Sequence, residues 1–409
     1  MITIMYAFSN AVNSMHSEDI KRLLKQSSGN NMISFAGGMP NNDLFPVKQI
    51  DEIYDALPIN LKKLCFQYGA ASGYPPLVRS LKSYLHKKGL PIDIDKILIT
   101  TGSLQAISII TQEFVNKGDI ILTENPSFVG ALSVFETYEA EIHGIPIDKD
   151  GIDIEALKQK IASLDKTPKL LYVTPNFHNP AGIIYTPERK KALLEVLSNT
   201  GIILIEDDAY SDLYFNEEDK YLTKPMKSYG LADVEIIYTG SFSKILGPGF
   251  RLGYMLSSPE IFEKAETVKQ ALDACTSNFM QILANEFLSQ HKLDPYLKFL
   301  RFEYRDRKNI LQQSLIKYMP EEVIWNEPKG GFYIWLKLPE YVSSTDVFKE
   351  SVEKGVVFVT GRTFDPSSKK DDRIRLSFSN MPKDTIEKGV KILSKVIKKA
   401  LKSIPSETV

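Results

Sequence analysis

The chain has 409 residues, 43% hydrophobic and 25% charged, so it can bury a large core and we expect two domains. Its formal net charge of −1 argues against nucleic acid or an anionic membrane as a partner. No run approaches the ~18 apolar residues that a membrane span needs, and the N-terminal MITIMYAFSN lacks the basic start of a signal peptide. We therefore expect a soluble, cytoplasmic protein.

Cysteine and histidine usage predicts neither a disulfide framework nor a metal centre. The two cysteines, Cys65 and Cys275, lie 210 positions apart and form no paired motif. The five histidines show no spacing typical of metal ligands. A reducing compartment and the absence of a metal site are the resulting expectations.

Between residues 96 and 256, short β-branched runs alternate with helical stretches. The expected strands are KILIT, DIILTE, KLLYVT and IILIEDDAY, and a helical pattern follows each of the first three. This alternation is typical of a mainly parallel sheet with helices on both faces. The continuous apolar character of the runs suits strands covered on both sides.

The pattern changes after residue 259. Long helices rich in Glu, Lys, Leu and Ala are expected up to 318, and an α+β pattern follows from 325, with FYIWLKL and RIRLSFS as strands. The predicted fold class is α/β, a large domain with a mainly parallel sheet flanked by helices, plus a smaller α+β domain. We expect an N-terminal arm over 1–45 that packs on the small domain, a large domain over 46–290 and a small domain over 291–409.

Polar motifs follow several of the expected strands, where ligands bind in open parallel sheets. TGSLQ places Gly102, Ser103 and Leu104 at the start of a helix, whose free N–H groups can hold a phosphate or can simply be capped by the serine. PNFHNPAG places Asn179 in a loop.

An acidic pair, Asp207 and Asp208, ends the apolar run IILIE and is followed by Ala209 and Tyr210. A carboxylate at the end of a buried strand is costly unless it meets a positive partner. Because side chains alternate along a strand, we expect only one of the two aspartates to face a site. Capping of a following helix is the alternative role.

One lysine stands apart from the solvated lysines of the chain. In SFSKILGPGFR, Lys244 follows Ser241 and Ser243 and precedes Arg251 by seven residues. An amine, an acid for a cationic ring, a helix start and an arginine together match what pyridoxal phosphate requires: a Schiff-base lysine, an aspartate and anion clamps. Arg251 and partial desolvation would lower the pKa of Lys244, so that its amine is neutral and reactive.

The sequence resembles the class I/II aminotransferases of the fold-type-I pyridoxal-phosphate enzymes. The likeness covers nearly the whole chain and is greatest to the branch containing 2-aminoadipate and kynurenine aminotransferases and the aminotransferase-like halves of certain bacterial regulators. The motifs that carry it are SFAGGMPNNDLFP, QYGAASGYPPLVR, TTGSLQAI, ENPSFVG, PNFHNPAG, EDDAY, SFSKILGPGFRLGY, GGFYIWL and RIRLSFS.

The resemblance implies roles for particular residues around the cofactor. Lys244 would carry the Schiff base, Asp207 would pair with the pyridinium nitrogen, and Tyr210 and Asn179 would bond the phenolic oxygen of the ring. Phe128 would lie over the ring face, where many relatives have tyrosine. The residues implied to hold the phosphate are Ser103, Leu104, Ser241 and Arg251.

Further residues are implied for the substrate and for a second subunit. Arg375 would clamp the substrate α-carboxylate, with Arg373 two positions earlier as the rival, and Gly38 would lie against the substrate by its backbone. Tyr68 would reach the phosphate in the neighbouring subunit, which implies a homodimer with shared active sites.

These features predict a pyridoxal-phosphate-dependent aminotransferase that moves an amino group from an α-amino acid to a 2-oxo acid, 2-oxoglutarate being the expected acceptor, by a ping-pong mechanism. A β-lyase, a decarboxylase or a racemase would share every motif. An effector-binding domain without catalysis is the alternative of another class, but only about 30 residues precede SFAGG, too few for a DNA-binding module.

The donor stays open among aromatic, branched and 2-aminoadipate-like amino acids. MHSEDIKRLLKQ offers Lys21 and Arg22 for side-chain recognition, although solvated helix charges are the simpler interpretation. The stretch FYIWL is interpreted as a buried strand with no binding role, and Gly330 and Gly331 before it as turn residues.

Overall fold

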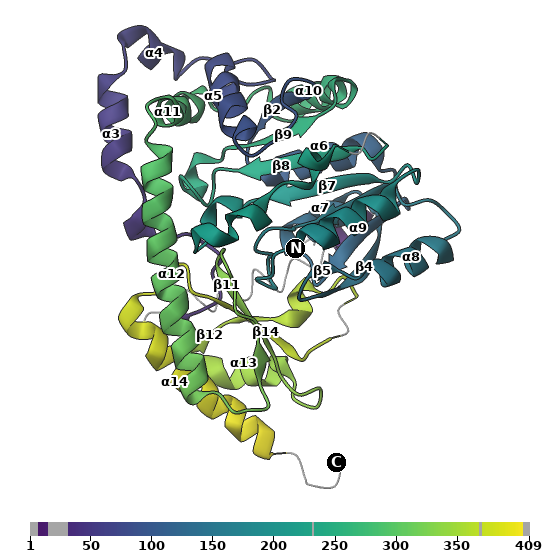
Figure 1. The fold of residues 1–409 in the computed structure, drawn as a ribbon, viewed down its shortest axis with the longest axis vertical. Coiled ribbons are helices and arrows are strands. Elements are labelled where there is room, and N and C mark those ends of the chain that lie inside the picture. Colours follow the sequence, from purple (N-terminus) through teal and green to yellow (C-terminus); the bar gives the residue numbers. More distant parts are fainter. Residues whose placement is uncertain (1–6, 15–31, 231–232, 368–369, 404–409) are drawn as a thin grey trace, which may run out of the picture.

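The structure is a computed structural model that describes residues 7–14, 32–230, 233–367 and 370–403. Figure 1 shows a larger lobe built on one broad sheet and a smaller lobe built on a second sheet. Helix α12 (Leu293–Tyr318) runs along both lobes. Within the described ranges, no helix is both long and apolar enough to cross a membrane.

The large sheet has eight strands in the order β2-β9-β8-β7-β6-β3-β4-β5. The pairs from β8 through β7, β6 and β3 to β4 are parallel, whereas β9 runs antiparallel to both β8 and β2, and β5 is antiparallel to β4. The strands span Lys96–Thr100 (β2), Ile120–Asn125 (β3), Glu141–Asp148 (β4), Gly151–Ile152 (β5), Leu170–Val173 (β6), Ile203–Asp208 (β7), Ile236–Ser241 (β8) and Gly253–Ser257 (β9).

Helices cover both faces of this sheet, since its central strands are apolar on both sides. On one face, side chains such as Ile107, Phe135 and Ile261 join a core with strand residues Ile205 and Ile237. The helices of this face are α6 (Ser103–Phe114), α7 (Val129–Thr137) and α10 (Pro259–Asp273). On the other face, the core is formed with α8 (Ile154–Ser163) and α9 (Pro187–Leu197).

The edge of the large lobe next to β2 is helical. Helix α5 begins with a Pro-Pro pair, which suits the first turn of a helix, and buries Leu77, Leu81 and Leu85 on one side. It packs on α11, as does α3. These helices span Val47–Ala56 (α3), Ile59–Leu64 (α4), Pro75–His86 (α5) and Asn278–Ser289 (α11), and a short helix, α1, covers Asn10–Ser14.

The smaller lobe contains a four-stranded antiparallel sheet in the order β10-β11-β14-β13. Helices α13 and α14 pack together beside it, and α14 also packs on α12. A separate parallel pair joins β1 near the N-terminus to β12. The bounds are Ile33–Ser34 (β1), Ile324–Trp325 (β10), Tyr333–Lys337 (β11), Ser344–Glu353 (α13), Val356–Val357 (β12), Val359–Thr360 (β13), Arg373–Ser377 (β14) and Lys383–Lys402 (α14).

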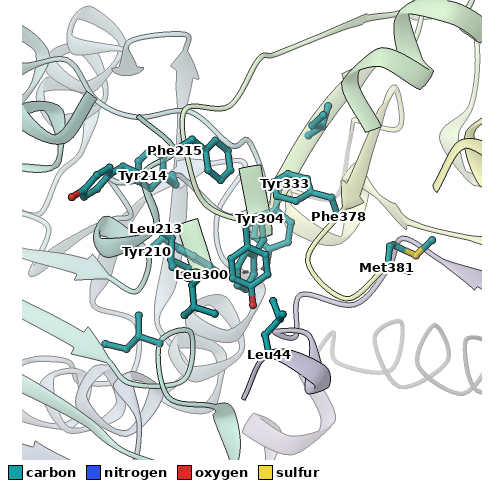
Figure 2. Packing of buried hydrophobic residues seen from close by; sticks show 14 of the residues in the cluster. Leu44, Tyr210, Leu213, Tyr214, Phe215, Leu300, Tyr304, Tyr333, Phe378 and Met381 are labelled. Carbon is teal, nitrogen blue, oxygen red and sulfur yellow. Dashed lines mark hydrogen bonds between the residues drawn. The ribbon is translucent and has the colours of Figure 1, made fainter. Parts of the chain in front are cut away.

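One hydrophobic core continues from the large lobe into the small one. Figure 2 shows Tyr210 and Leu213, which follow β7, close to Tyr304 of α12 and to Tyr333 of the small sheet. Leu44, from the segment after β1, joins the same cluster. Packed side chains of this core therefore join the two lobes and fix the position of one sheet relative to the other.

The predicted fold class is confirmed, including the mainly parallel large sheet. The β4–β5 hairpin and helices α3 to α5 and α8 were not predicted from the sequence. The division at residues 45 and 290 stays a prediction, and much of the expected arm, with Lys21 and Arg22, lies outside the described residues.

Candidate active site

A cavity of about 330 Å³ opens where the carboxyl ends of β7 and β8 face the small sheet. All of the site residues predicted above line it except Tyr68. The predicted residues at the cavity are Gly38, Ser103, Leu104, Phe128, Asn179, Asp207, Tyr210, Ser241, Lys244, Arg251 and Arg375.

Lys244 lies just beyond the end of β8, and its Nζ donates a hydrogen bond of 2.9 Å to the carbonyl oxygen of Gly38. Burial, together with the positive charges of Arg375 and Arg251, lowers the pKa of Lys244 to about 8 against the opposing effect of Asp207. An amine with this pKa is neutral in a substantial fraction of molecules near pH 8. Lys244 is therefore prepared to act as a nucleophile or base.

Asp207 is 4% exposed and faces the cavity. Its carboxylate accepts hydrogen bonds from Tyr172 Oη (2.7 Å) and Thr239 Oγ1 (2.8 Å). Burial raises the pKa of Asp207 to about 6, although these two hydrogen bonds oppose the rise. Among the described residues, no cation lies within ion-pair distance of this carboxylate, so its charge is free for a positive ligand.

The next residue, Asp208, turns to the other side of β7 as strand alternation predicts. It accepts hydrogen bonds from Tyr238 Oη and from the backbone N–H of Ser211, and Lys88 Nζ lies 4.0 Å away. These donors and the nearby lysine balance the charge of Asp208 within the fold. Asp208 does not line the cavity.

The start of α6 forms one end of the cavity. In the first turn of a helix the N–H groups, here those of Ser103 and Leu104, have no acceptor inside the helix. A Cβ at Gly253 would come within 2.6 Å of Ser103 N, and a Cβ at Gly102 within 3.1 Å of Arg251 Nη2. The absence of side chains at Gly253 and Gly102 therefore leaves room beside the N–H of Ser103 and the guanidinium of Arg251.

Arg251 has a left-handed backbone (φ 46°). Its guanidinium contacts with the described residues are long, with Nη1 3.5 Å from the carbonyl of Pro248 and Nη2 3.4 Å from that of Thr101. Its guanidinium therefore retains donors for a ligand. Free helix N–H groups with an adjacent cation form an anion site, which fits a phosphate.

Arg375 enters the cavity from β14 of the small sheet. Its Nη1 donates to Asn179 Oδ1 (2.8 Å) and its Nη2 to the carbonyl of Ala36 (2.6 Å), while its buried Nε has no partner among the described residues. Burial lowers the pKa of Arg375. Arg373, the rival for the carboxylate clamp, does not line this cavity but another one.

The FYIWL stretch contributes strand β11, as predicted, and its Tyr333 also lines the cavity. Its Oη lies 3.0 Å from Tyr210 Oη, and the guanidinium carbon of Arg375 lies 4.5 Å from its ring centroid. A Cβ at Gly38 would clash with Tyr333 Oη at 2.3 Å. Tyr333 is 1% exposed, and the sequence shows it as one aromatic residue of an apolar strand.

Other placements are simpler. Phe128 precedes α7 and is partly buried at the cavity wall, and Ser241 Oγ accepts a hydrogen bond from Ser243 N (3.1 Å). Tyr68 is 80% exposed and lies away from the cavity of its own chain. Tyr172, which holds Asp207, was not singled out from the sequence.

The family model for aminotransferases of class I and II matches residues 31–393. The chain therefore belongs to this family and is an aminotransferase, as its motifs predicted. It is 35% identical to aromatic-amino-acid aminotransferase 1 of Thermococcus litoralis, over 97% of this chain and 95% of that protein.

Solved structures agree with this assignment. The kynurenine aminotransferase of Pyrococcus horikoshii, solved in complex with PMP, superposes with a TM-score of 0.92 at 35% identity, covering 97% of this chain and 98% of that one. LysN, the α-aminoadipate aminotransferase of Thermus thermophilus, solved with N-(5'-phosphopyridoxyl)-L-leucine, gives a TM-score of 0.84 at 29% identity, covering 97% of this chain and 98% of that one.

Proposed function

We propose that the enzyme binds pyridoxal phosphate in the Lys244 cavity and transfers an amino group from an α-amino acid to a 2-oxo acid in ping-pong order. The observation that carries this proposal is the pairing, in one cavity, of a lysine whose pKa is lowered to about 8 with a buried carboxylate that lacks a cation. When bound, the cofactor supplies the electron sink that allows a proton to leave the substrate α-carbon.

The residues present fit this cofactor. The N–H groups of Ser103 and Leu104, with Ser241 and Arg251, would hold its phosphate at the start of α6. Asp207 would hold the protonated ring nitrogen. This contact supports the proposal because it would satisfy a buried charge that otherwise meets only hydroxyl groups.

The remaining contacts would orient the ring. Tyr210 and Asn179 would donate to its phenolic oxygen, and Phe128 would lie against its face. Tyr333, hydrogen-bonded to Tyr210, would fix the direction of that phenol.

Lys244 Nζ would take the proton from the α-carbon of the donor in the first half-reaction and deliver a proton to the α-carbon of the new amino acid in the second. Its amine suits this task because burial and two neighbouring guanidinium groups lower its pKa, so that a substantial fraction is neutral near pH 8. The hydrogen bond to the Gly38 carbonyl would hold Nζ in the cavity while its amine is free.

Arg375 would clamp the α-carboxylate that amino-acid and 2-oxo-acid substrates share. Its Nε, unpartnered among the described residues, and its place in the lining of the Lys244 cavity support this role. One carboxylate site for both substrates requires the first product to leave before the second substrate binds. The expected order is therefore ping-pong.

We infer that two copies of the chain assemble and that Tyr68 completes the site of the partner subunit. The support is the exposure of apolar residues close to it in sequence, since Phe66 is 79% exposed and Ile59 is 70% exposed. Sedimentation of the purified protein measures the assembly, and a monomer with full activity would contradict this inference.

The test of the proposal separates the two half-reactions. Aromatic, branched-chain and 2-aminoadipate donors are added singly to the purified holoenzyme without an acceptor, and the cofactor absorption is recorded. An accepted donor should convert the aldehyde form to the amine form, and 2-oxoglutarate should then restore the aldehyde form. Continuous release of an oxo acid and ammonia without any acceptor would instead indicate a lyase.

A further inference from the structure

A second cavity, of about 410 Å³, lies between the large sheet and the small sheet. Within the described residues it shares no lining residue with the Lys244 cavity. Its large-lobe side comes from the ends of β3 and β4 and from Ala181 and Ile183, and its small-lobe side from β10, β11 and the start of β14. Its volume lies in the range of small-molecule sites.

The walls of this cavity are apolar and aromatic. Both tryptophans of the chain, Trp325 and Trp335, line it and are only partly buried, and Ile147 and Ile324 add aliphatic surface. Indole rings left accessible in a concave site offer flat surface to an aromatic ligand. The cavity therefore favours a ligand with a ring.

The cavity is also basic. Of the two acidic residues that line it, Asp148 is bound by Arg189 Nη2 (2.8 Å) and Asp365 accepts from Asn125 Nδ2 (3.1 Å) and Ser367 N (2.9 Å). Both carboxylates are thus already engaged. The cationic side chains that line it are Lys149, Lys337, Lys370 and Arg373.

Arg373 is the cation best placed to bind an anion. Its one ion-pair contact in the described part of the chain joins Nε to Asp372 Oδ2 at 3.5 Å, longer than a strong charge-assisted hydrogen bond. Its terminal nitrogens have no acceptor among the described residues, and partial burial lowers the pKa of Arg373. A guanidinium in this state presents its donor fork to a carboxylate.

We propose that this cavity is a second ligand site, separate from the Lys244 cavity, for small aromatic carboxylates. The carboxylate would bind Arg373, and the ring would pack on Trp325 and Trp335. Because its walls come from both lobes, an occupant would bridge the two sheets beside the strand that carries Arg375. The ligand would act as an effector, since Lys244 does not line this cavity.

The tryptophans provide a direct measurement of binding. The holoenzyme is titrated with 3-phenylpropanoate, which has a ring and a carboxylate but neither an amino nor an oxo group, and tryptophan fluorescence is followed. We expect a saturable change, and weaker binding of 2-phenylethanol, which lacks the carboxylate. Absence of a saturable change with 3-phenylpropanoate would overturn the proposal.

Matched variants locate the site. Arg373→Gln should weaken 3-phenylpropanoate binding by about tenfold or more, because one charged contact is lost. Arg362→Gln, an exposed arginine outside the cavity lining, should leave the dissociation constant unchanged. An unchanged constant in Arg373→Gln, or equal weakening in both variants, would refute the assignment.

Two more titrations complete the test. Arg375→Gln should keep the wild-type dissociation constant, and loss of binding there would place the probe in the Lys244 cavity instead. Should Arg373→Gln fail to fold, as judged by circular dichroism, Lys337→Gln removes another lining cation and must weaken binding for the proposal to stand. None of these measurements depends on which reaction the enzyme catalyses.

Discussion

The two sides of β7 at its carboxyl end use the same residue type for different purposes. Asp207 and Asp208 are almost equally buried, at 4% and 5% exposure. Asp208 has Lys88 4.0 Å away, whereas the side chains that bond Asp207 in the described part of the chain are the hydroxyls of Tyr172 and Thr239. The difference indicates two roles for a buried carboxylate. One whose charge is paired with a lysine of the fold is structural, whereas one without such a partner can bind a positively charged ligand.

Replacing each aspartate by asparagine tests this comparison with the largest expected effect. Asp207→Asn should lower kcat/KM by about 10²–10³-fold, because the group that stabilises charge at the cofactor ring is lost. Steady-state assays with the best donor and 2-oxoglutarate measure the effect. A loss below about tenfold would show that Asp207 does not hold the cofactor.

The matched variant Asp208→Asn should leave kcat/KM nearly unchanged. It should instead lower the free energy of unfolding by about 1–3 kcal/mol, because the bonds from Tyr238 and Ser211 and the charge near Lys88 are disturbed. Urea denaturation measures this. Equal losses of activity in the two variants would contradict the assignment of a ligand-binding role to Asp207 and a structural role to Asp208.

Lys244→Met tests how much the buried amine of Lys244, in the same cavity as Asp207, lowers the free energy of unfolding. The pKa of Lys244 falls from 10.5 to about 8 on folding, a difference worth up to about 3 kcal/mol. This destabilisation is fully present below pH 8, where Lys244 is protonated in both states. It fades between pH 8 and 10.5 and is absent above 10.5, where both states have lost the proton.

In the cofactor-free protein, Lys244→Met should therefore raise the free energy of unfolding at pH 7 and raise it less at pH 10. Lys395→Met, at an exposed lysine of α14, should change little at either pH. Urea titrations at both pH values measure the effect. A stability gain that grows with pH would contradict the lowered pKa.

Arg375, from β14 of the small sheet, lines the same cavity as Asp207. Arg375→Gln should raise KM for the donor and for the acceptor by about 10- to 100-fold, as expected for loss of a hydrogen-bonded charge. Arg362→Gln serves as the exposed control. An effect on one substrate only would mean that the two carboxylates bind at different places.

The smallest effect is expected from removing single hydroxyls on the two sides. Tyr172→Phe removes a hydrogen bond that holds down the pKa of Asp207, so that pKa should rise above about 6. The pH at which the cofactor-free protein loses affinity for pyridoxal phosphate on acidification should rise with it, with activity at pH 7 reduced by less than about tenfold.

Tyr238→Phe removes the equivalent hydroxyl from Asp208. It should leave the pH dependence of cofactor binding in place and cost about 1 kcal/mol of stability. A shifted pH dependence in this variant, or none in Tyr172→Phe, would show that the hydroxyls do not act through their own aspartates.

Much of this arrangement could be predicted from the sequence because it is local. Apolar runs that end in polar motifs placed Asp207 and Lys244 at one edge of the sheet, and strand alternation separated Asp207 from Asp208. The arginine of β14 was chosen from resemblance, and its contact with Asn179 joins positions 196 residues apart.

What could not be predicted depends on contacts between distant segments. Tyr172 looks like any apolar strand residue until β6 pairs with β7 and brings it to Asp207. Tyr333 and the tryptophan cavity require the small sheet to be placed against the large one. A single sequence carries no direct signal for such pairings.

The central claim is that Lys244 and Asp207 contact opposite ends of one pyridoxal phosphate molecule. The most direct measurement is borohydride reduction of the purified holoenzyme, followed by proteolysis and mass spectrometry. The account predicts a single phosphopyridoxyl group on the peptide that contains Lys244, and none in Lys244→Met. Reduction that labels a different lysine, or none, would contradict it.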